Sequence, residues 1–464
     1  MSEHPAPPSS IDEPPNGPRT PDGPTAQDPA IPDPTTPNPG APDADWKRRV
    51  GLFLGAQAIS LFGSSIVQFA IMWHLTLVLK AGWVIMLYSL VAFVPQALVS
   101  LFGGALADRM NRRTVIVVSD TAIALVTLGL ALAMTFGDAS LWLILVAVAA
   151  RSIGQGFQQP AVAALLPQLA PTSALMRVNG INQTINSAMA LLSPVVAGAV
   201  YAWGGLVPTF GIDVVTALIG VGIVLTIPVA TVRSADATGT SLTRDLVDGL
   251  RYVLGHRTIA WLMVLYTVIF TLVVAPSFLV PLFIARTFSD AVWPLSIYEA
   301  AFSAGMLVGG ALIATVAAKG NQSRMLLWSC LSFGLVSAAF GLTPLLGRTG
   351  GLWTTFSLSF GVAVAIPFFS APVMTLLQTS VEPEFMGRVF SVTNIVAVLG
   401  MPAGMVVLGP LADRVPFEAI FIVTGLAAFA FTVASFLAEP GREVLAMSAI
   451  PPSDPASSES GPIA

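Results

Sequence analysis

The stretch Gly104-Ala-Leu-Ala-Asp108-Arg109-Met-Asn-Arg112-Arg113 is a charged turn between two long apolar segments. Residues 82–103 before it carry no charge, and residues 114–137 after it carry only Asp120. About 20 helical residues at ~1.5 Å each match the ~30 Å hydrocarbon core of a bilayer, so each segment is long enough to span a membrane. A turn with three arginines must lie in water, and we expect it on the cytoplasmic side. The stretch therefore predicts a polytopic membrane protein.

The composition agrees with this prediction and excludes several other classes. The chain has 464 residues, of which 55% are hydrophobic and 10% charged, with a mean hydropathy of +0.79. A soluble domain carries roughly 25% charged residues. No basic stripe interleaved with aromatic residues is present, so nucleic-acid binding is not expected. Cys330 has no cysteine to pair with, and three scattered histidines exclude a Cys/His metal site, so we expect no metal and no cofactor.

The apolar segments predict an all-α membrane protein with twelve transmembrane helices in two six-helix bundles. Most are joined by short turns marked by Gly, Pro or Asn. The expected spans are 49–79, 82–104, 113–136, 139–160, 175–203, 206–230, 259–285, 292–317, 323–343, 350–378, 385–411 and 416–438.

The polar segments divide the chain into five parts. Residues 1–45 hold 14 prolines and 8 acidic residues, and we expect a disordered cytoplasmic tail. Residues 46–230 form the first six-helix bundle and 259–439 the second. The central cytoplasmic loop, 231–258, contains apolar residues at helical spacing, which predicts an amphipathic helix on the membrane surface. Residues 440–464 are expected to be a second disordered cytoplasmic tail.

Basic residues predict that both termini are cytoplasmic. With the N-terminus inside, sixteen of the 21 Lys and Arg residues fall in cytoplasmic segments. Four fall on the outer side, and one, Arg151, lies within a span. Such a bias fixes orientation, and the protein is expected in the cell membrane with many passes through it.

The two halves also resemble each other weakly. The tetrapeptide at 103–106 recurs at 309–312, an offset of 206 residues. Residues 175–182 match residues 386–393 at an offset of 211. Two parallel six-helix repeats form a substrate cavity at their interface, which is an arrangement typical of transporters.

The charged turn resembles the signature loop between helices 2 and 3 of the major facilitator superfamily. The resemblance implies a gating motif at Gly104, Asp108, Arg109, Arg112 and Arg113. Asp108 at a helix end can pair with Arg112 and with a neighbouring helix dipole, which would hold the cytoplasmic side shut. The alternative is that these charges only set topology.

Two further motifs resemble those of drug/proton antiporters within this superfamily. Arg151 lies deep in a span, where an arginine costs roughly 2.5–3.5 kcal/mol on insertion scales, so it needs a partner or a wet cavity. The stretch from Arg151 to Gly156 resembles the R-x-x-Q-G motif, although a purely structural arginine is the alternative. Ser193, Pro194, Ala197 and Gly198 resemble a softened form of the antiporter motif G-P-x-x-G-G. In such a motif, the proline leaves a backbone carbonyl without its helical hydrogen bond, and the small residues let two helices approach closely.

Two stretches narrow the resemblance to one branch. Residues 383–391 and 248–252 resemble the branch that contains macrolide-efflux proteins and the enterobactin exporter. The superfamily implies alternating access, with an amphipathic small molecule and protons as partners in the lipid bilayer, and we expect a monomer. The substrate class would be a drug, antibiotic, bile acid or siderophore.

Proton coupling needs a titratable group in the pathway, and the spans offer few. Asp213 and Glu299 each lie about seven residues, or roughly 10 Å, below the outer face. Together with Arg151 they are the proton-coupling candidates, with a helix–helix hydrogen bond as the alternative for each carboxyl group. Asp120 lies nearer the cytoplasmic end, where we expect it to pair with basic residues.

The sequence thus predicts a proton-coupled exporter of amphipathic small molecules. An importer of the same fold remains open, because sequence does not settle the direction of transport. A membrane receptor or scaffold with a transporter-like body is the alternative from another class. An enzyme is not expected, since no nucleophile–base pair or metal cluster is evident.

Overall fold

The computed structural model is helical throughout the part of the chain that it describes, with no strand in that part. The described residues are 45–109, 111–137, 140–228, 242–274, 277–316, 321–382 and 384–447. The two predicted tails lie outside these residues, except for the first part of the C-terminal one.

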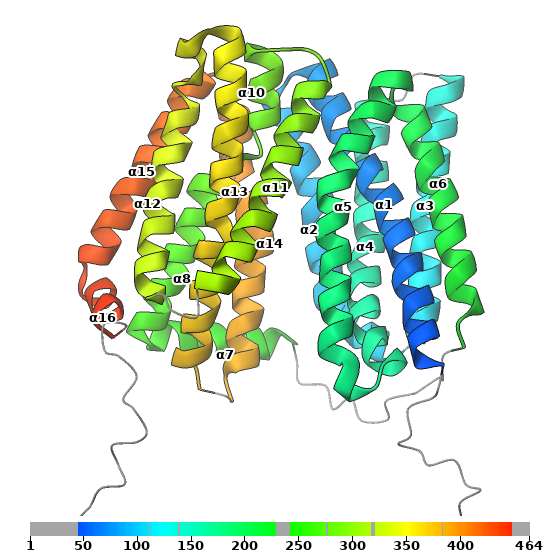
Figure 1. Ribbon diagram of the computed structural model, residues 1–464, viewed down its shortest axis with the longest axis horizontal. Coiled ribbons are helices and arrows are strands. Elements are labelled where there is room, and N and C mark those ends of the chain that lie inside the picture. The colour runs from blue at the N-terminus through cyan, green and yellow to red at the C-terminus, as the bar shows by residue number, and fades with distance from the viewer. Residues whose placement is uncertain are drawn as a thin grey trace, which may run out of the picture. The chain divides into compact units, whose positions relative to one another are not determined.

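The first six long helices follow one another through tight turns (Figure 1). The Asn111 side chain accepts a 3.0 Å hydrogen bond from Arg113 N where the third helix begins, and Ser140 caps the fourth in the same way. Gly205 has φ +74° between the fifth and sixth, a conformation that favours glycine. The helices are α1 (Trp46–Leu79), α2 (Gly82–Arg109), α3 (Arg112–Phe136), α4 (Leu141–Leu169), α5 (Leu175–Gly204) and α6 (Leu206–Thr226), with a 3₁₀ turn η1 (Thr172–Ala174) before α5.

The second group contains one broken span and five continuous helices. The broken span consists of α8 (Arg257–Ile269), a π-helical segment η2 (Phe270–Val274) and α10 (Val280–Thr287). After it come α11 (Trp293–Val316), α12 (Gln322–Phe340), a 3₁₀ turn η3 (Thr343–Leu346), α13 (Gly347–Ser380), α14 (Met386–Leu411) and α15 (Phe417–Leu437). Shorter helices flank this group at α7 (Leu242–Gly255) and α16 (Glu439–Met447).

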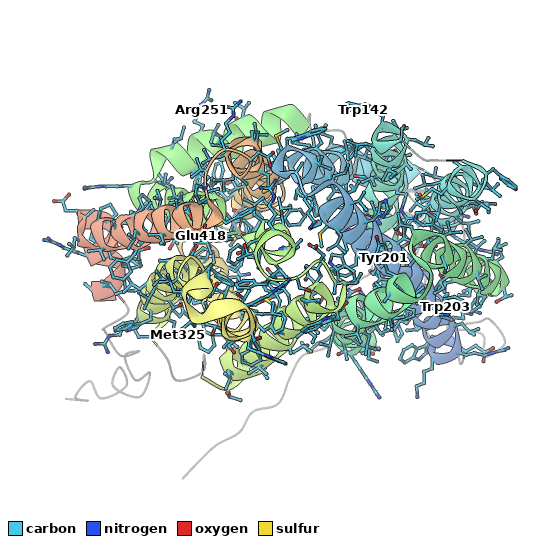
Figure 2. The ribbon with its side chains drawn as sticks, turned by 90° about the horizontal axis from the view of Figure 1, so that it is seen from above. Trp142, Tyr201, Trp203, Arg251, Met325 and Glu418 are labelled. Atoms are coloured by element: carbon cyan, nitrogen blue, oxygen red, sulfur yellow. The ribbon has the colours of Figure 1, made fainter. Side chains whose placement is uncertain are left out.

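These helices confirm the predicted fold class of twelve transmembrane helices in two bundles. Among the described residues, ten helices are each long and apolar enough to cross a membrane. The bent pair Val247–Gly255 and Arg257–Val273 gives an eleventh if it is counted as one span, and α14 contributes a shorter apolar stretch, Leu399–Leu411. Large apolar side chains cover the outside of the molecule, such as Trp142 and Trp203, which are 64% and 83% exposed (Figure 2). Lipid is the solvent that such a surface requires.

Most contacts between helices lie within each of the two groups, and a smaller set of contacts joins the groups. Within the first group, α1 packs on α5 and α6, and α4 packs on α2 and α3. Within the second, α13 packs on α11 and α12, and α15 packs on α12. The groups meet where α2 lies against α14 and where α5 lies against α11. We call the end at which α1 begins the proximal end, and the end at which α1 finishes the distal end.

The predicted amphipathic segment between the groups is helical. The α7 helix is followed by α8 at a bend of 111°, measured between Val247–Gly255 and Arg257–Val273. On one face, Tyr252 is buried and stacks on Phe385 at a centroid distance of 4.4 Å. On the other, Leu254 is 71% exposed. A position of this helix on the membrane surface remains a prediction.

The expected disorder from residue 440 onward is wrong for the first residues of that segment, because α16 continues to Met447. Ser323 Oγ donates a 2.8 Å hydrogen bond to the carbonyl of Val444, and Val444 is buried. Gly441 packs so closely on Ser435 that an added Cβ would lie 2.4 Å from its carbonyl oxygen. An apolar side chain and a glycine on one helix face therefore dock this segment on the bundle.

Candidate functional site

A buried ion pair joins four helices of the first bundle. Arg151 Nη1 of α4 lies 2.5 Å from Asp213 Oδ2 of α6, and both side chains are almost completely buried. Thr127 of α3 donates a 2.8 Å hydrogen bond to Asp213 Oδ2, and its hydroxyl also contacts Arg151. Ser64 Oγ of α1 donates to Asp213 Oδ1 at 3.0 Å. The carboxylate therefore has a partner at each oxygen.

This network explains how an arginine is tolerated inside an apolar bundle. A buried charge is stable only when its opposite charge and its hydrogen bonds are supplied together. Two of the three proton-coupling candidates, Arg151 and Asp213, are thus brought together, as the need for a partner predicted. Thr127 and Ser64 were not singled out from the sequence, since a hydroxyl in a span is usually bonded to its own helix.

A polar cavity of about 380 Å³ lies beside this network. Its lining is formed by the middle of α1, the first half of α5 and the later part of α4. Seven amide side chains contribute to it: Gln57, Gln68, Gln155, Gln158, Gln159, Asn182 and Asn186. Gln57 Nε2 is buried without a hydrogen-bond partner within the described structure. Amide side chains carry both hydrogen-bond donors and acceptors, so the lining of this cavity suits the uncharged polar groups of a ligand.

The expectation that Asp120 pairs with basic residues is wrong. Asp120 is only 3% exposed, and Gln158 Nε2 donates a hydrogen bond to its Oδ1. Its Oδ2 is buried and has no hydrogen-bond partner in the described part of the chain. The reason is helix geometry, because Asp120 faces α4 across the bundle instead of the proximal end where the arginines lie.

Glu299, the third coupling candidate, lies apart from Arg151 and Asp213. It lines a second cavity of about 220 Å³ between the two bundles. From the first bundle this cavity receives Gln68, Phe69, Met72 and Tyr88; from the second it receives Ser277, Phe278, Pro281, Tyr298, Glu299, Phe302 and Met401. Gln68 lines both cavities, so they adjoin at this side chain.

The gating motif is only partly within the described structure. Gly104, Asp108 and Arg109 lie in the last turns of α2, but their side chains are outside the description. Arg112 Nη1 donates a 3.2 Å hydrogen bond to the carbonyl of Ala164. Arg113 donates to the carbonyl of Leu225. Arg113 therefore binds a C-terminal carbonyl of α6, at the negative end of that helix, and Arg112 binds a carbonyl in the last two turns of α4.

The antiporter-like motif lies where α5 meets α11. Ser193, Pro194, Ala197 and Gly198 are all buried. A Cβ added at Gly198 would lie 1.8 Å from Ser296 Oγ, so only glycine permits this approach of the two helices. The motif thus forms part of the contact between bundles near the distal end.

A second contact between bundles, which we call the distal latch, was missed from the sequence. Asp413, just after α14, accepts hydrogen bonds from Gly82 N at 2.7 Å and Trp83 N at 3.0 Å, the first residues of α2. Arg286 of α10 lies 2.5 Å from Asp413 and donates through Nε to the carbonyl of Lys80 at 2.7 Å. The latch is formed by Lys80, Gly82, Trp83, Arg286 and Asp413.

The latch combines an ion pair with the positive end of a helix. Partial burial of Asp413 would raise the pKa of its carboxyl group. The N–H groups of Gly82 and Trp83 and the Arg286 guanidinium favour the anion more strongly, so the pKa lies below its usual value. In the sequence, the latch is visible only as charged residues in the outer turns. The count of basic residues used these charges to predict topology and nothing more.

The sequence of this chain is similar to those of known transporters. The sequence profile of the Major Facilitator Superfamily matches residues 53–405. Macrolide efflux protein A of Streptococcus pyogenes is 28% identical over 387 residues, covering 82% of this chain and 93% of that protein. Multidrug efflux pump Tap of Mycobacterium bovis is 26% identical over 345 residues, covering 72% of this chain and 80% of that protein.

Solved structures agree on the fold. A bacterial homologue of the iron transporter ferroportin in an inward-facing state gives a TM-score of 0.63 at 15% identity, covering 84% of this chain and 98% of that one. A POT family transporter in complex with a thioalcohol-conjugated peptide gives 0.68 at 13% identity, covering 86% and 96%. At these identities the likeness concerns architecture alone.

Proposed function

Since the chain belongs to the Major Facilitator Superfamily, we propose that it exports amphipathic small molecules in exchange for protons by alternating access. It is a transporter and not an enzyme, and it is a multi-span protein of the cell membrane. Export is supported by the two relatives named as efflux proteins, which match most of the chain.

One observation supports alternating access most directly. The two cavities adjoin at Gln68, deep between the bundles, while the distal ends of the bundles are joined by the latch and by Gly198 against Ser296. A substrate site closed at one end is one of the two states that alternating access requires. Breaking the distal contacts and closing the proximal ends would produce the other state.

The orientation completes the proposed cycle. The distribution of basic residues supports a cytoplasmic proximal end, with both termini on the same side. The described state would then receive substrate from the cytoplasm or the inner leaflet. In the opposite state, Asp108 would act with Arg112 and Arg113 to hold the cytoplasmic ends together, as the gating motif predicts. We propose that a monomer performs the whole cycle.

Proton coupling is proposed for two places. Asp213 is held by Arg151, so protonation would release the arginine and loosen the contact among α1, α3, α4 and α6. Glu299 lies at the boundary between bundles, where a change of charge directly affects their contact. A carboxyl group that carries a proton into the site on one side and releases it on the other couples the two fluxes.

Two other functions predict different measurements. An importer of the same fold would move substrate inward together with protons. A receptor or scaffold would bind ligand without any flux. The contact between bundles through charged and glycine-dependent elements favours a moving transporter over a static receptor.

Efflux from cells tests the proposal. Cells expressing the protein would be loaded with members of a panel of hydrophobic antibiotics, dyes, bile acids and catechol siderophores, and efflux followed with and without a protonophore. Arg151→Ala and Glu299→Gln would be compared with wild type and with Glu418→Gln, a carboxylate outside both cavities, at equal membrane abundance. We expect efflux that a protonophore abolishes and that only the first two variants lose. Efflux that persists in both would remove these residues from coupling, and uptake in place of efflux would favour the importer.

A further inference from the structure

A groove of about 570 Å³ lies between α12 and α13, which run side by side in the second bundle (Figure 1). It is larger than either cavity described above, and the residues that line those cavities come from other segments of the chain. On α12 its lining extends from Asn321, at the proximal end, to Ser332. That length is about 16 Å along the helix axis, close to half of the ~30 Å hydrocarbon core of a bilayer. The groove therefore has the depth of one lipid leaflet.

The proximal end of the groove carries a positive charge. Arg324 is the one charged residue among the described residues that line it. The Arg324 side chain is exposed and makes no ion pair and no hydrogen bond with any residue that the structure describes. Arg112 and Arg113, at the start of α3 in the first bundle, instead donate to helix carbonyls. A guanidinium without a protein partner is suited to a phosphate group, to which it can donate two charge-assisted hydrogen bonds.

An exposed aromatic residue lies next to this charge. Trp328 is one helical turn after Arg324, lines the same groove and is 68% exposed. Figure 2 shows Met325, which also lines the groove, near the outer edge of the second bundle. Tryptophan is enriched where the lipid headgroups meet the hydrocarbon core, so this end of the groove matches the headgroup level of a bilayer.

Beyond Arg324 the lining of the groove becomes apolar. Ser329 and Ser332 donate their hydroxyl groups at 2.8 Å to carbonyls of α12 itself, so these donors are already used. Phe368 of α13 contributes to the facing wall. Gly361 leaves that wall open, because a Cβ added there would meet nothing within 4 Å. Such a lining suits a hydrocarbon chain, whereas a polar ligand would lose its hydrogen bonds to water without replacement.

From this order of chemistry along the groove, we propose that it binds one anionic phospholipid, with the phosphate on Arg324 and one acyl chain between α12 and α13. A zwitterionic phospholipid would also bring an ammonium group, and none of the described residues that line the groove is an acid that could pair with it. Both helices belong to the same bundle, so the site keeps its shape while the bundles move relative to each other. The lipid is therefore a resident ligand of the second bundle and not the transported substrate.

A comparison of two lipids tests the proposal. Full-length protein, purified in a neutral detergent and freed of lipid, would be mixed with dioleoylphosphatidylglycerol or dioleoylphosphatidylcholine, which share their acyl chains and differ in headgroup charge. Native mass spectrometry would measure the fraction of protein that carries one lipid. We expect wild type to bind the anionic lipid roughly tenfold more tightly, the factor that a hydrogen bond to a charged group contributes. Equal affinity for the two lipids would overturn the proposal without any variant.

Substitution of the arginine locates the phosphate. Arg324→Gln removes the charge from an exposed side chain, and the preference for the anionic lipid should be lost. Arg177→Gln, at an exposed arginine of α5, is the matched control and should keep the wild-type preference. An unchanged preference in Arg324→Gln would overturn the assignment.

A substitution inside the groove locates the acyl chain. Gly361→Leu places a side chain in the open space of the groove and should weaken the binding of both lipids. Gly222→Leu, at a glycine of α6 that also has nothing within 4 Å of an added Cβ, should bind both lipids as wild type does. Thermal unfolding of each variant shows whether it is folded, and if Gly361→Leu is not, the Arg324→Gln comparison decides alone. Wild-type binding by a folded Gly361→Leu would overturn the placement of the lipid in this groove.

Discussion

Asp413 accepts a 2.7 Å hydrogen bond from the backbone nitrogen of Gly82, although 331 residues separate them in the chain. The carboxylate thereby sits on the N-terminus of α2, where the partial positive charge of a helix is concentrated. One residue of the second bundle thus caps the first bundle and, through Arg286, also holds the end of α1. In the proposed cycle, this contact would have to break before the distal end opens.

Removal of the Asp413 carboxylate should open that end. Asp413→Ala loses two backbone hydrogen bonds and an ion pair at a partly exposed site, which we estimate at about 1–2 kcal/mol, or a factor of about 5–30 in the ratio of closed to open states. Spin labels at the exposed positions Trp203 and Leu345, in a Cys330→Ala background, would report the distance between bundles.

Asp290 provides the matched control. It pairs with Lys80 at the same end, but its side chain is 74% exposed, and such pairs contribute only about 0–1 kcal/mol. Asp290→Ala should therefore change the distance distribution less than Asp413→Ala. Equal spin-label distance distributions for wild type and Asp413→Ala would show that the latch does not hold the distal ends of the bundles together.

The latch should not respond to pH in the physiological range. Because the pKa of Asp413 is lowered in the closed state, closure is stabilised by the anion at every pH above the usual value of about 3.9. The stabilisation is lost only as the pH falls through the lowered pKa. The spin-label distance should therefore be constant between about pH 5 and 8 apart from changes that Asp413→Ala also shows. A transition near neutral pH that is absent from Asp413→Ala would contradict this assignment.

Glycine at position 198 should be required for closure, and glycine at position 180 should not. A Cβ at Gly198 would lie 1.8 Å from Ser296 Oγ and 2.9 Å from its Cβ, so Gly198→Ala must push α5 from α11. Gly180 is on the same helix with nothing within 4 Å of the added atom. Its replacement by alanine should be neutral or stabilising by roughly 0.5–1 kcal/mol.

Thermal unfolding in detergent and the same label pair would compare these two variants. A lower melting temperature and a larger distance are expected for Gly198→Ala alone. Identical behaviour of both variants would show that the close approach does not limit packing.

The Arg151–Asp213 pair should be interdependent. Arg151→Leu leaves a buried carboxylate unpaired, which costs about 3–5 kcal/mol, whereas Arg151→Leu with Asp213→Leu removes both charges and should recover much of the loss. Arg177→Leu, at an exposed arginine of α5, should have little effect on stability. Thermal unfolding of wild type, Arg151→Leu, Asp213→Leu and the double variant measures the coupling, and Arg177→Leu serves as the control.

Transport by the double variant separates two roles for that pair. A stable double variant that does not exchange substrate for protons is expected if the pair participates in coupling. Wild-type exchange in the same protein would make the pair purely structural. Additive losses of stability in the single and double variants would show that the two charges do not interact.

The fold was predictable because span length and hydropathy depend on local sequence. Segments such as 82–103 carry no charge, and the bilayer leaves an uncharged segment of that length few structures other than a helix. The need of Arg151 for a partner followed from the same argument, and Asp213 was among the few acids available. The broken span around η2 was not predicted, because the apolar run from 259 to 285 has no obvious interruption other than Pro276 and Pro281.

The details of the site depend on which helix faces meet, and sequence alone does not fix helix rotation. Asp120 was assigned to basic partners by its depth, yet it faces Gln158. Glu299 and Asp213 were grouped by equal depth, yet Glu299 lines the cavity between the bundles and Asp213 is buried in the network with Arg151. The latch joins residues at helix ends that are distant in the chain, and its charged members look like ordinary topology charges. To predict that the latch residues lie together, one would need to know which helices of the two bundles contact each other.

Reconstituted protein offers the most direct test of proton-coupled export. Vesicles containing the protein, a trapped pH-sensitive dye and a substrate identified in the efflux panel would be monitored for substrate and proton fluxes together. We predict that substrate movement in one direction drives protons in the other, and that an imposed pH gradient moves substrate against its concentration gradient. Movement of both in the same direction, or substrate flux that leaves internal pH unchanged and ignores the gradient, would contradict the account.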